Sequence, residues 1–371
     1  MTFVGLRCTA SYPNISPGWI RESPLQAVYP HLDAYSAAIP TTAWGRVPGK
    51  GREMAEVDFR ELPDIDGTQD EMTDATERTE QVRGISELAM EAGTEMLGAM
   101  TGNPDAFGIK TGYPSLDRLL GGFQPGQLVT IGSRTGVGKT AFALNLALNS
   151  ASSGSRVLFA TLATPGKEIA RRLTCSQAMV NIDNFRSGRI SPQEMANINE
   201  AVGELGKLDI LVDDTPRMNV KTLAASCGKM AEGATRPLVI VDFLQLMRMQ
   251  DSKAYRGNRA VELADIMAEL KVMARELGIA LVVLSQLNRP DYGKPDALRP
   301  RPWQLTGSAA IEQMSDIVML LDKSETEAEA ERDDRPDFGI TRVILAKNNS
   351  GPNGEVDLMF LPSACKFYEM Q

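Results

Sequence analysis

Residues 132–140 read Gly-Ser-Arg-Thr-Gly-Val-Gly-Lys-Thr, and a short apolar run precedes them while a helical stretch, Thr140 to Ser150, follows. In such a phosphate-binding loop the glycines let backbone N–H groups curl around phosphate oxygens. A lysine reaches the β and γ phosphates, and a hydroxyl holds magnesium. Lys139 and Thr140 occupy these two positions, whereas Ser133 stands where the regular pattern has glycine. The alternative, a glycine-rich turn that binds nothing, does not explain the strand-loop-helix context.

The loop therefore predicts a site for ATP and Mg²⁺. The predicted nucleotide-binding residues are Ser133, Arg134, Thr135, Gly136, Val137, Gly138, Lys139, Thr140 and Ala141.

Short β-branched runs alternate with helical stretches after about Ile109. The predicted strands are Leu128–Gly132, Arg156–Leu162, Leu208–Asp213, Pro237–Phe243, Ala280–Ser285, Asp316–Leu321 and Thr341–Ala346. Helices are predicted between most of them, notably at Arg259–Leu277. Continuous apolar strands separated by helices indicate an α/β fold, in which a mostly parallel sheet is covered on both faces.

The region before this fold has a different pattern. Residues 1–78 are rich in Pro, Gly, Thr and Asp without a sustained period, which predicts an extended N-terminal arm. From Thr79 to Met100 apolar residues recur every three or four positions, as in an amphipathic helix. Asn103 and Pro104 then end it. We assign residues 79–104 to a linker helix, whose apolar stripe can dock on its own subunit or on a neighbour.

Composition limits the possible classes of protein. The chain has 371 residues, of which 43% are hydrophobic and 23% charged, and we find no apolar run near the roughly 20 residues that a membrane span needs. The expected location is the cytoplasm, without a membrane partner. The net charge of -9 is concentrated in Asp58–Asp74 and Glu325–Asp337 and does not exclude DNA binding by local basic loops. Four scattered cysteines and one histidine predict free thiols and no zinc site.

Two strand ends carry further polar candidates. A phosphate-loop enzyme places a carboxylate near the magnesium at the end of a buried strand, and Asp242 follows Leu238–Val241. Thr140 and Asp242 are thus the predicted metal ligands, although an aspartate at this place can also only cap a helix. Gln286, at the end of another apolar strand, is positioned to sense the γ-phosphate. Taken alone, such a residue is more often an ordinary surface glutamine.

Several collinear motifs make the chain resemble the DnaB family of replicative DNA helicases over Gly108 to Met370. The matching stretches are residues 111–117 (Thr-Gly-Tyr-Pro-Ser-Leu-Asp), 121–126 (Gly-Gly-Phe-Gln-Pro-Gly), 138–145 (Gly-Lys-Thr-Ala-Phe-Ala-Leu-Asn), 213–216 (Asp-Asp-Thr-Pro), 241–247 (Val-Asp-Phe-Leu-Gln-Leu-Met), 274–277 (Ala-Arg-Glu-Leu), 284–287 (Leu-Ser-Gln-Leu), 311–313 (Ile-Glu-Gln), 346–347 (Ala-Lys) and 351–352 (Gly-Pro). The resemblance implies a RecA-like phosphate-loop NTPase domain over residues 108–371.

The resemblance also implies a hexameric ring with ATP bound between subunits. Lys139, Thr140, Asp242 and Gln286 match the family, and Lys347 matches the lysine that reaches the nucleotide of the neighbouring subunit. Two catalytic positions differ. Ala163 stands where the family has the glutamate that activates water, and Asn349 stands where it has an arginine finger. Since both groups accelerate phosphoryl transfer, hydrolysis is expected to be impaired while ATP binding survives.

The predicted DNA-binding residues lie in two loops that the resemblance places at the central channel of the ring. They are Arg248, Lys253, Arg256, Arg259, Thr306, Gly307 and Ser308. Cationic groups and backbone N–H groups hold single-stranded phosphates in such channels. The first loop is alternatively only a solvated polar loop. The second departs from the family at Thr306 and Gly307, where an Arg-Glu or Arg-Gly pair is usual.

The leading interpretation is a ring-forming helicase subunit that acts in DNA replication on single-stranded DNA. Primase or a helicase loader is a further expected partner, although the primase-contacting helical domain of the family is not recognisable in residues 1–78. The alternatives are a non-hydrolysing ATP-binding scaffold or loader, which the loss at Ala163 and Asn349 favours, and a RecA-like recombinase, since the fold alone does not decide function.

Overall fold

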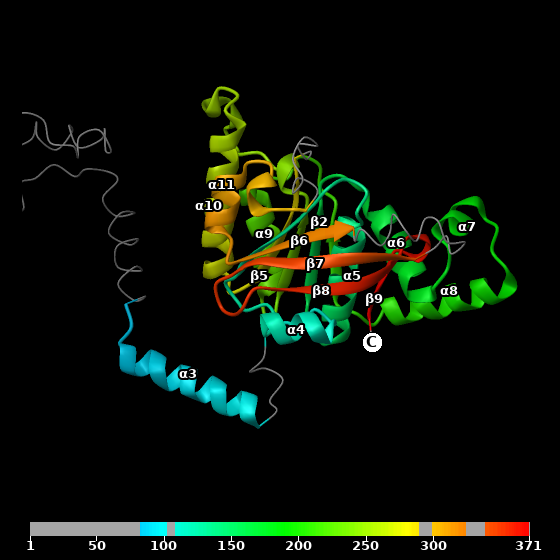
Figure 1. Ribbon diagram of the computed structural model, residues 1–371, viewed down its shortest axis with the longest axis horizontal. Helices are drawn as coiled ribbons and strands as arrows, with labels where there is room; N and C mark the ends of the chain where they lie inside the picture. The colour runs from blue at the N-terminus through cyan, green and yellow to red at the C-terminus, as the bar shows by residue number, and fades with distance from the viewer. Residues whose placement is uncertain (1–81, 102–107, 289–298, 324–337, 371) are drawn as a thin grey trace, which may run out of the picture. The chain divides into compact units, whose positions relative to one another are not determined.

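The core of the protein is one nine-stranded sheet, seen in a computed structural model that describes residues 82–101, 108–288, 299–323 and 338–370. The predicted arm, residues 1–78, and the acidic stretch 325–337 lie outside the described residues. The strands are β1 (Leu128–Ser133), β2 (Val157–Thr161), β3 (Ile210–Asp213), β4 (Leu238–Asp242), β5 (Ala280–Gln286), β6 (Ile317–Lys323), β7 (Gly339–Asn348), β8 (Gly354–Leu361) and β9 (Lys366–Glu369). They lie in the order β3-β2-β4-β5-β1-β6-β7-β8-β9, and the neighbouring strands β6, β7 and β8 are labelled side by side in Figure 1.

Strands β3, β2, β4, β5, β1 and β6 are parallel, and β7, β8 and β9 continue the sheet in antiparallel fashion. Strands β1, β2 and β4 are buried at every position, as expected of parallel strands covered on both faces. The predicted mostly parallel α/β fold is confirmed, with a strand at each predicted place. The sequence prediction missed β8 and β9. In β8 the alternation of buried Val356, Leu358 and Phe360 with less buried residues was the available signal.

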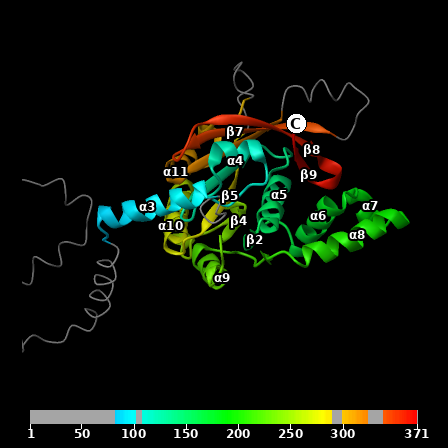
Figure 2. The same cartoon turned by 90° about the horizontal axis from the view of Figure 1, so that it is seen from below.

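Helices and short 3-10 turns lie around the sheet, and the helices at 182–187 and 192–205 pack mainly against the helix at 166–178. They are α4 (Pro114–Leu120), α5 (Lys139–Ser152), α6 (Gly166–Ala178), α7 (Ile182–Ser187), α8 (Pro192–Leu205), α9 (Val220–Ala231), α10 (Arg259–Glu276), α11 (Ser308–Met314), η3 (Leu244–Leu246), η4 (Ser252–Tyr255), η6 (Pro302–Gln304) and η7 (Pro362–Ala364). Helix α5 lies on one side of β4 and β5, while α9 and α10 lie on the other (Figure 2). Two large apolar clusters result, one on each face.

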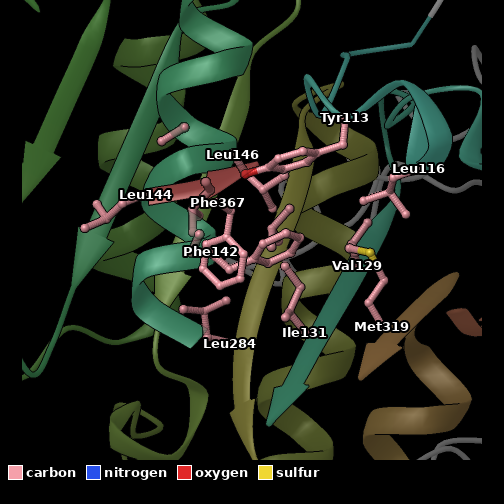
Figure 3. Packing of buried hydrophobic residues seen from close by; sticks show 14 of the residues in the cluster. Tyr113, Leu116, Val129, Ile131, Phe142, Leu144, Leu146, Leu284, Met319 and Phe367 are labelled. Atoms are coloured by element: carbon pink, nitrogen blue, oxygen red, sulfur yellow. The ribbon is translucent and has the colours of Figure 1, made fainter. Parts of the chain in front are cut away.

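The helix that follows the phosphate loop is held firmly in the first cluster. Phe142 of α5 stacks on Tyr113 with 5.8 Å between ring centroids and meets Phe367 of β9 edge-on at 5.4 Å (Figure 3). Each such ring contributes about 1.5–3 kcal/mol when fully buried. The buried side-chain amide of Asn145 adds hydrogen bonds between α5 and β9. It donates to Cys365 O at 2.7 Å and accepts the Phe367 N–H at 3.1 Å. Strand β9 thereby anchors α5, the helix that follows the phosphate loop.

The parallel strands give the sheet two distinct edges. We call the edge where β1, β2, β4, β5 and β6 end the carboxyl edge, and the opposite one the amino edge. Because ligands of open α/β sheets bind outside the carboxyl ends of the strands, the carboxyl edge is where a nucleotide site is expected.

The linker helix is α3, which spans Ile85–Met100 and is described by itself. The prediction placed its start at Thr79, but residues 82–84 are not helical. Gly84 begins the helix instead, because its carbonyl accepts the N–H groups of Glu87 and Leu88. The predicted breakers Asn103 and Pro104 lie outside the described residues. Several apolar side chains of α3, including Ile85 and Met96, are exposed. Among the described helices, none is long and apolar enough to cross a membrane.

Candidate nucleotide-binding site

The phosphate loop lies at the carboxyl edge between β1 and α5, so the nine predicted nucleotide-binding residues from Ser133 to Ala141 are contiguous there. Gly136 and Gly138 have φ values of 86° and 101°, which L side chains rarely adopt. A Cβ on Gly138 would also lie 3.0 Å from a ring carbon of Phe360. Ser133, in contrast, is fully buried as the last residue of β1, where no positive φ is required. Serine is therefore tolerated at this position.

Lys139 begins α5 and turns its ammonium toward the ends of β4 and β5. Its Nζ donates to Ser285 O at 3.0 Å and lies 5.1 Å from the ring centroid of Phe243. Burial lowers the pKa of Lys139 to about 8, although the Asp242 carboxylate acts in the opposite direction. A half-buried ammonium with one carbonyl partner is suited to bind negative phosphate oxygens.

Thr140 and Asp242, the two predicted metal ligands, are in direct contact. Thr140 Oγ1 donates to Asp242 Oδ2 at 2.8 Å, and Asp242 is 2% exposed. Burial raises the pKa of Asp242, while the Thr140 hydroxyl and the Lys139 and Arg172 cations oppose the shift. A hydroxyl beside one buried carboxylate fits Mg²⁺, which usually takes one or two protein oxygens, substrate phosphates and water. When bound, the ion would supply positive charge that neutralises phosphate oxygens.

Gln286 is brought to the loop by the pairing of β1 with β5. Its Nε2 donates to Thr135 Oγ1 at 3.1 Å, so a side chain at the end of β5 touches the phosphate loop. Gln245 in η3, which was not among the predicted site residues, accepts the Gln286 N–H at its Oε1 at 3.2 Å. The available signals were its polarity beside the buried Leu244 and its place in the matching stretch 241–247.

Ala163 lies in the turn that follows β2. Thr161 ends β2 beside Asp242, and its hydroxyl donates to Thr164 O at 2.8 Å and accepts the Thr164 N–H at 3.1 Å. This turn leaves Ala163 exposed at the carboxyl edge. Glu168 lies in α6 and forms ion pairs with Arg171, Arg172 and Arg186. Its carboxylate is therefore already matched by three cations.

Lys347 and Asn349 lie at the amino edge, away from the phosphate loop of their own chain. Lys347 pairs with Val318 near the start of β6, whereas the end of β1 pairs with Leu321. Lys347 Nζ donates to the carbonyls of Glu312 and Ser315 at 2.7 Å, and to Gln313 O at 3.3 Å, at the C-terminus of α11. The exposed Asn349 donates its N–H to Asp316 O at 2.9 Å.

The two ends of the first predicted DNA loop are held by ion pairs, whereas its middle, at Lys253 and Arg256, is exposed and is called its tip. Arg248 and Arg259 both pair with the buried Glu262 carboxylate, at 3.0 and 2.6 Å. Arg259 also donates to Gln245 O and Met247 O. Lys253 and Arg256 are exposed on and after η4, and neither forms an ion pair with a described residue.

The second predicted DNA segment lies at the carboxyl edge, directly beside Gln286. Thr306 donates its N–H to Gln286 O at 3.0 Å and its hydroxyl to Asn288 Oδ1 at 2.8 Å. Gly307 has a φ of 88° and precedes Ser308, the first residue of α11. The fold thus brings this segment to Gln286, which sequence spacing did not indicate.

The sheet order, the phosphate loop and the Thr140–Asp242 pair define a RecA-like phosphate-loop NTPase. The profile of the family described as "DnaB-like helicase C terminal domain" matches residues 108–369. The chain belongs to this family.

Relatives and solved structures agree with the family match. The chain is 34% identical over 265 residues to the replicative DNA helicase DnaB of Geobacillus stearothermophilus, covering 71% of this chain and 57% of that protein. It is 34% identical over 269 residues to the replicative DNA helicase DnaC of Bacillus subtilis, with 72% and 58% covered. The chain thus spans under two thirds of these relatives.

Two solved structures are similar in fold. The "ATPase Domain of G40P" has a TM-score of 0.69 and 27% identity, with 78% of this chain and 100% of that chain covered. A DnaB-like replicative helicase, described together with its interactions with primase, has a TM-score of 0.67 and 25% identity, with 82% and 72% covered.

Proposed function

We propose that this chain is a subunit of a ring-forming DNA helicase motor that binds Mg-ATP and single-stranded DNA and acts in DNA replication. The observation that carries the proposal is the meeting of Lys139, Asp242 and Gln286 at the carboxyl edge, with the Thr306 segment in hydrogen-bond contact with Gln286. Such a site can bind a nucleotide beside a DNA-binding segment. By analogy with the helicase described with primase, primase or a loader is the expected further partner.

The separation of the proposed catalytic residues onto opposite edges of the sheet supports the ring. Lys347 and Asn349 lie at the amino edge, so they can serve only the nucleotide of a neighbouring subunit. In a ring, Lys347 would exchange the three carbonyls at the end of α11 for phosphate oxygens. A head-to-tail contact of this kind closes into a ring when the rotation between subunits allows.

Removal of residues 1–100 is expected to reduce the assembly to monomers or weak oligomers, because the exposed apolar side chains of α3 would then no longer be available to strap adjacent subunits together. Static light scattering measures the mass of each assembly. The matched control removes residues 1–78 and retains α3, and it should still assemble. Full rings without residues 1–100 would show that α3 is not the strap.

Single-stranded DNA is expected to bind through the tip of the first loop. Replacing Lys253 and Arg256 together by alanine should weaken binding of a fluorescent oligonucleotide and reduce the slope of log affinity against log salt by about 1.4, since each lost phosphate contact contributes about 0.7. Replacing Arg189 and Lys207 by alanine provides a charge-matched control. Both are exposed, Arg189 between α7 and α8 and Lys207 just after α8. An unchanged salt slope would exclude Lys253 and Arg256 from the interface.

A non-hydrolysing scaffold or loader is the second candidate function. Ala163 and Asn349 favour it, because they lack the carboxylate that activates water and the cation that neutralises transition-state charge. Both functions include ATP binding. They are distinguished by the rate of ATP hydrolysis and by whether substitutions at positions 163 and 349 restore it.

A further inference from the structure

The side chain of Gln245 joins three segments that lie far apart in the sequence. Its Nε2 donates to Ser285 Oγ at 2.8 Å and to Thr306 O at 3.3 Å, and its Oε1 accepts the Gln286 N–H at 3.2 Å. One carboxamide therefore contacts the end of β5 twice and the second predicted DNA segment once. Nothing in the nucleotide chemistry described above uses it.

The first connection of Gln245 leads to the nucleotide. Gln286, whose N–H it accepts, donates its own Nε2 to Thr135 Oγ1 in the phosphate loop at 3.1 Å. The neighbouring Ser285 O accepts the Lys139 ammonium at 3.0 Å. When phosphates draw Lys139 and the Gln286 side chain toward them, the backbone at the end of β5 is the part that must adjust.

The second connection leads to the Thr306 segment. The Thr306 N–H donates to Gln286 O at 3.0 Å, and Asn288 N–H donates to Gln304 O at 2.7 Å, so residues 304–306 pair with the extension of β5. Gly307 follows with a φ of 88°, and a Cβ there would lie 2.9 Å from Leu263 Cδ1. The segment is thus held on both sides, and its position depends on that of Gln286.

We propose that Gln245 is a positioning residue that couples the nucleotide site to the Thr306–Ser308 segment. Its amide bonds to both the Gln286 backbone and the Thr306 carbonyl. A shift of the Gln286 backbone therefore displaces the Thr306 carbonyl, and the reverse also holds. ATP and single-stranded DNA then change each other's affinity by one common factor, as linkage requires. This inference rests on the proposed function, because it assumes that the chain binds both ligands.

The test compares single-stranded DNA affinity with and without a non-hydrolysable ATP analogue. The coupling ratio is the affinity for single-stranded DNA under one of these conditions divided by that under the other, the larger over the smaller. In the unaltered chain this ratio is expected to fall within about 5–150, the usual range of allosteric coupling. Gln245→Met keeps a similar side-chain length but removes all three hydrogen bonds, so the ratio should fall to about one, while affinity for the analogue alone changes by no more than about threefold. Because coupling is reciprocal, DNA must change the affinity for the analogue by the same ratio.

Gln127→Met is the matched control at the amino edge. Gln127 also bonds through both ends of its carboxamide: its Oε1 accepts the Gln124 N–H at 2.9 Å, and its Nε2 donates to Ser350 Oγ at 3.2 Å. Loss of these two bonds should leave the ratio unchanged. A second variant, Gln245→Glu, keeps the acceptor for Gln286 N–H but loses the donor to Thr306, and an intermediate ratio is expected.

The outcomes separate this inference from the proposed function. Failure of the unaltered chain to bind single-stranded DNA overturns the proposed function. A chain that binds both ligands without coupling, or one that keeps its coupling in Gln245→Met, overturns the role of Gln245. Hydrogen exchange on the unaltered chain tests the link even if both variants misfold. The analogue without DNA should slow exchange of the Thr306 amide, which makes no contact with the phosphate loop, and an unchanged rate contradicts the proposal.

Discussion

Ala163→Glu is expected to raise the rate of ATP hydrolysis by about 100- to 10,000-fold, the usual contribution of a positioned general base. The turn closed by the Thr161 hydroxyl presents residue 163 at the carboxyl edge, and Thr161 pairs with Asp242 beside the proposed magnesium site. Thr140, Asp242 and Gln286 are already placed there. A carboxylate at position 163 could therefore orient a water for attack on the γ-phosphate.

Steady-state release of inorganic phosphate measures this effect. Ala163→Gln is the matched control, because it has the same length without a basic carboxylate and should give little gain. Asn349→Arg should help chiefly when Ala163→Glu is present, since residues that act in one step are not additive. Strand separation should recover together with hydrolysis.

Two results would contradict this assignment. Turnover of the unaltered chain at about ten per second, a typical enzyme rate, would show that position 163 is not the missing catalytic position. If neither substitution raises turnover, the scaffold or loader function replaces the helicase motor.

Lys139→Ala is expected to abolish measurable ATP binding rather than only slow turnover. Lys139 is the cation at the centre of the site, where its partner would be the phosphates of bound ATP. Removing one partner of a hydrogen-bonded charge pair costs about 2–5 kcal/mol, or roughly 30- to 5,000-fold in affinity. Isothermal titration with a non-hydrolysable analogue measures the loss. Affinity equal to that of the unaltered chain would show that the loop amides alone hold the phosphates.

The same charge gives ATP binding a specific pH dependence. Because the pKa of the free Lys139 is lowered to about 8, roughly half of the ammonium groups lack their proton at pH 8. Bound phosphates raise this pKa, so binding takes up a proton, and affinity falls as the pH rises above about 8. Titrations in buffers of different ionisation enthalpy measure the uptake. Lys139→Arg remains charged over this range and should remove the dependence.

The fold could be predicted from the sequence because its signals are local. Parallel strands buried on both faces read as unbroken apolar runs, as in Leu238–Val241, and a phosphate loop is one contiguous segment with fixed spacing. Local patterns also marked Thr140, in the first turn of α5, and Asp242, the last residue of β4. The antiparallel β8 and β9 were missed, because their signal is a weaker alternation of buried and exposed positions.

The sequence by itself determined the fold class, the phosphate loop with Lys139 and Thr140, and the departures at Ala163 and Asn349. The tertiary structure alone decided that Lys347 lies at the amino edge, opposite the loop, because this depends on β7 running antiparallel to β6. It also decided that Gln245 bonds to residues 41 and 61 positions away. Such side-chain contacts follow from strand order and register, which bring distant segments together and leave no local pattern in the chain.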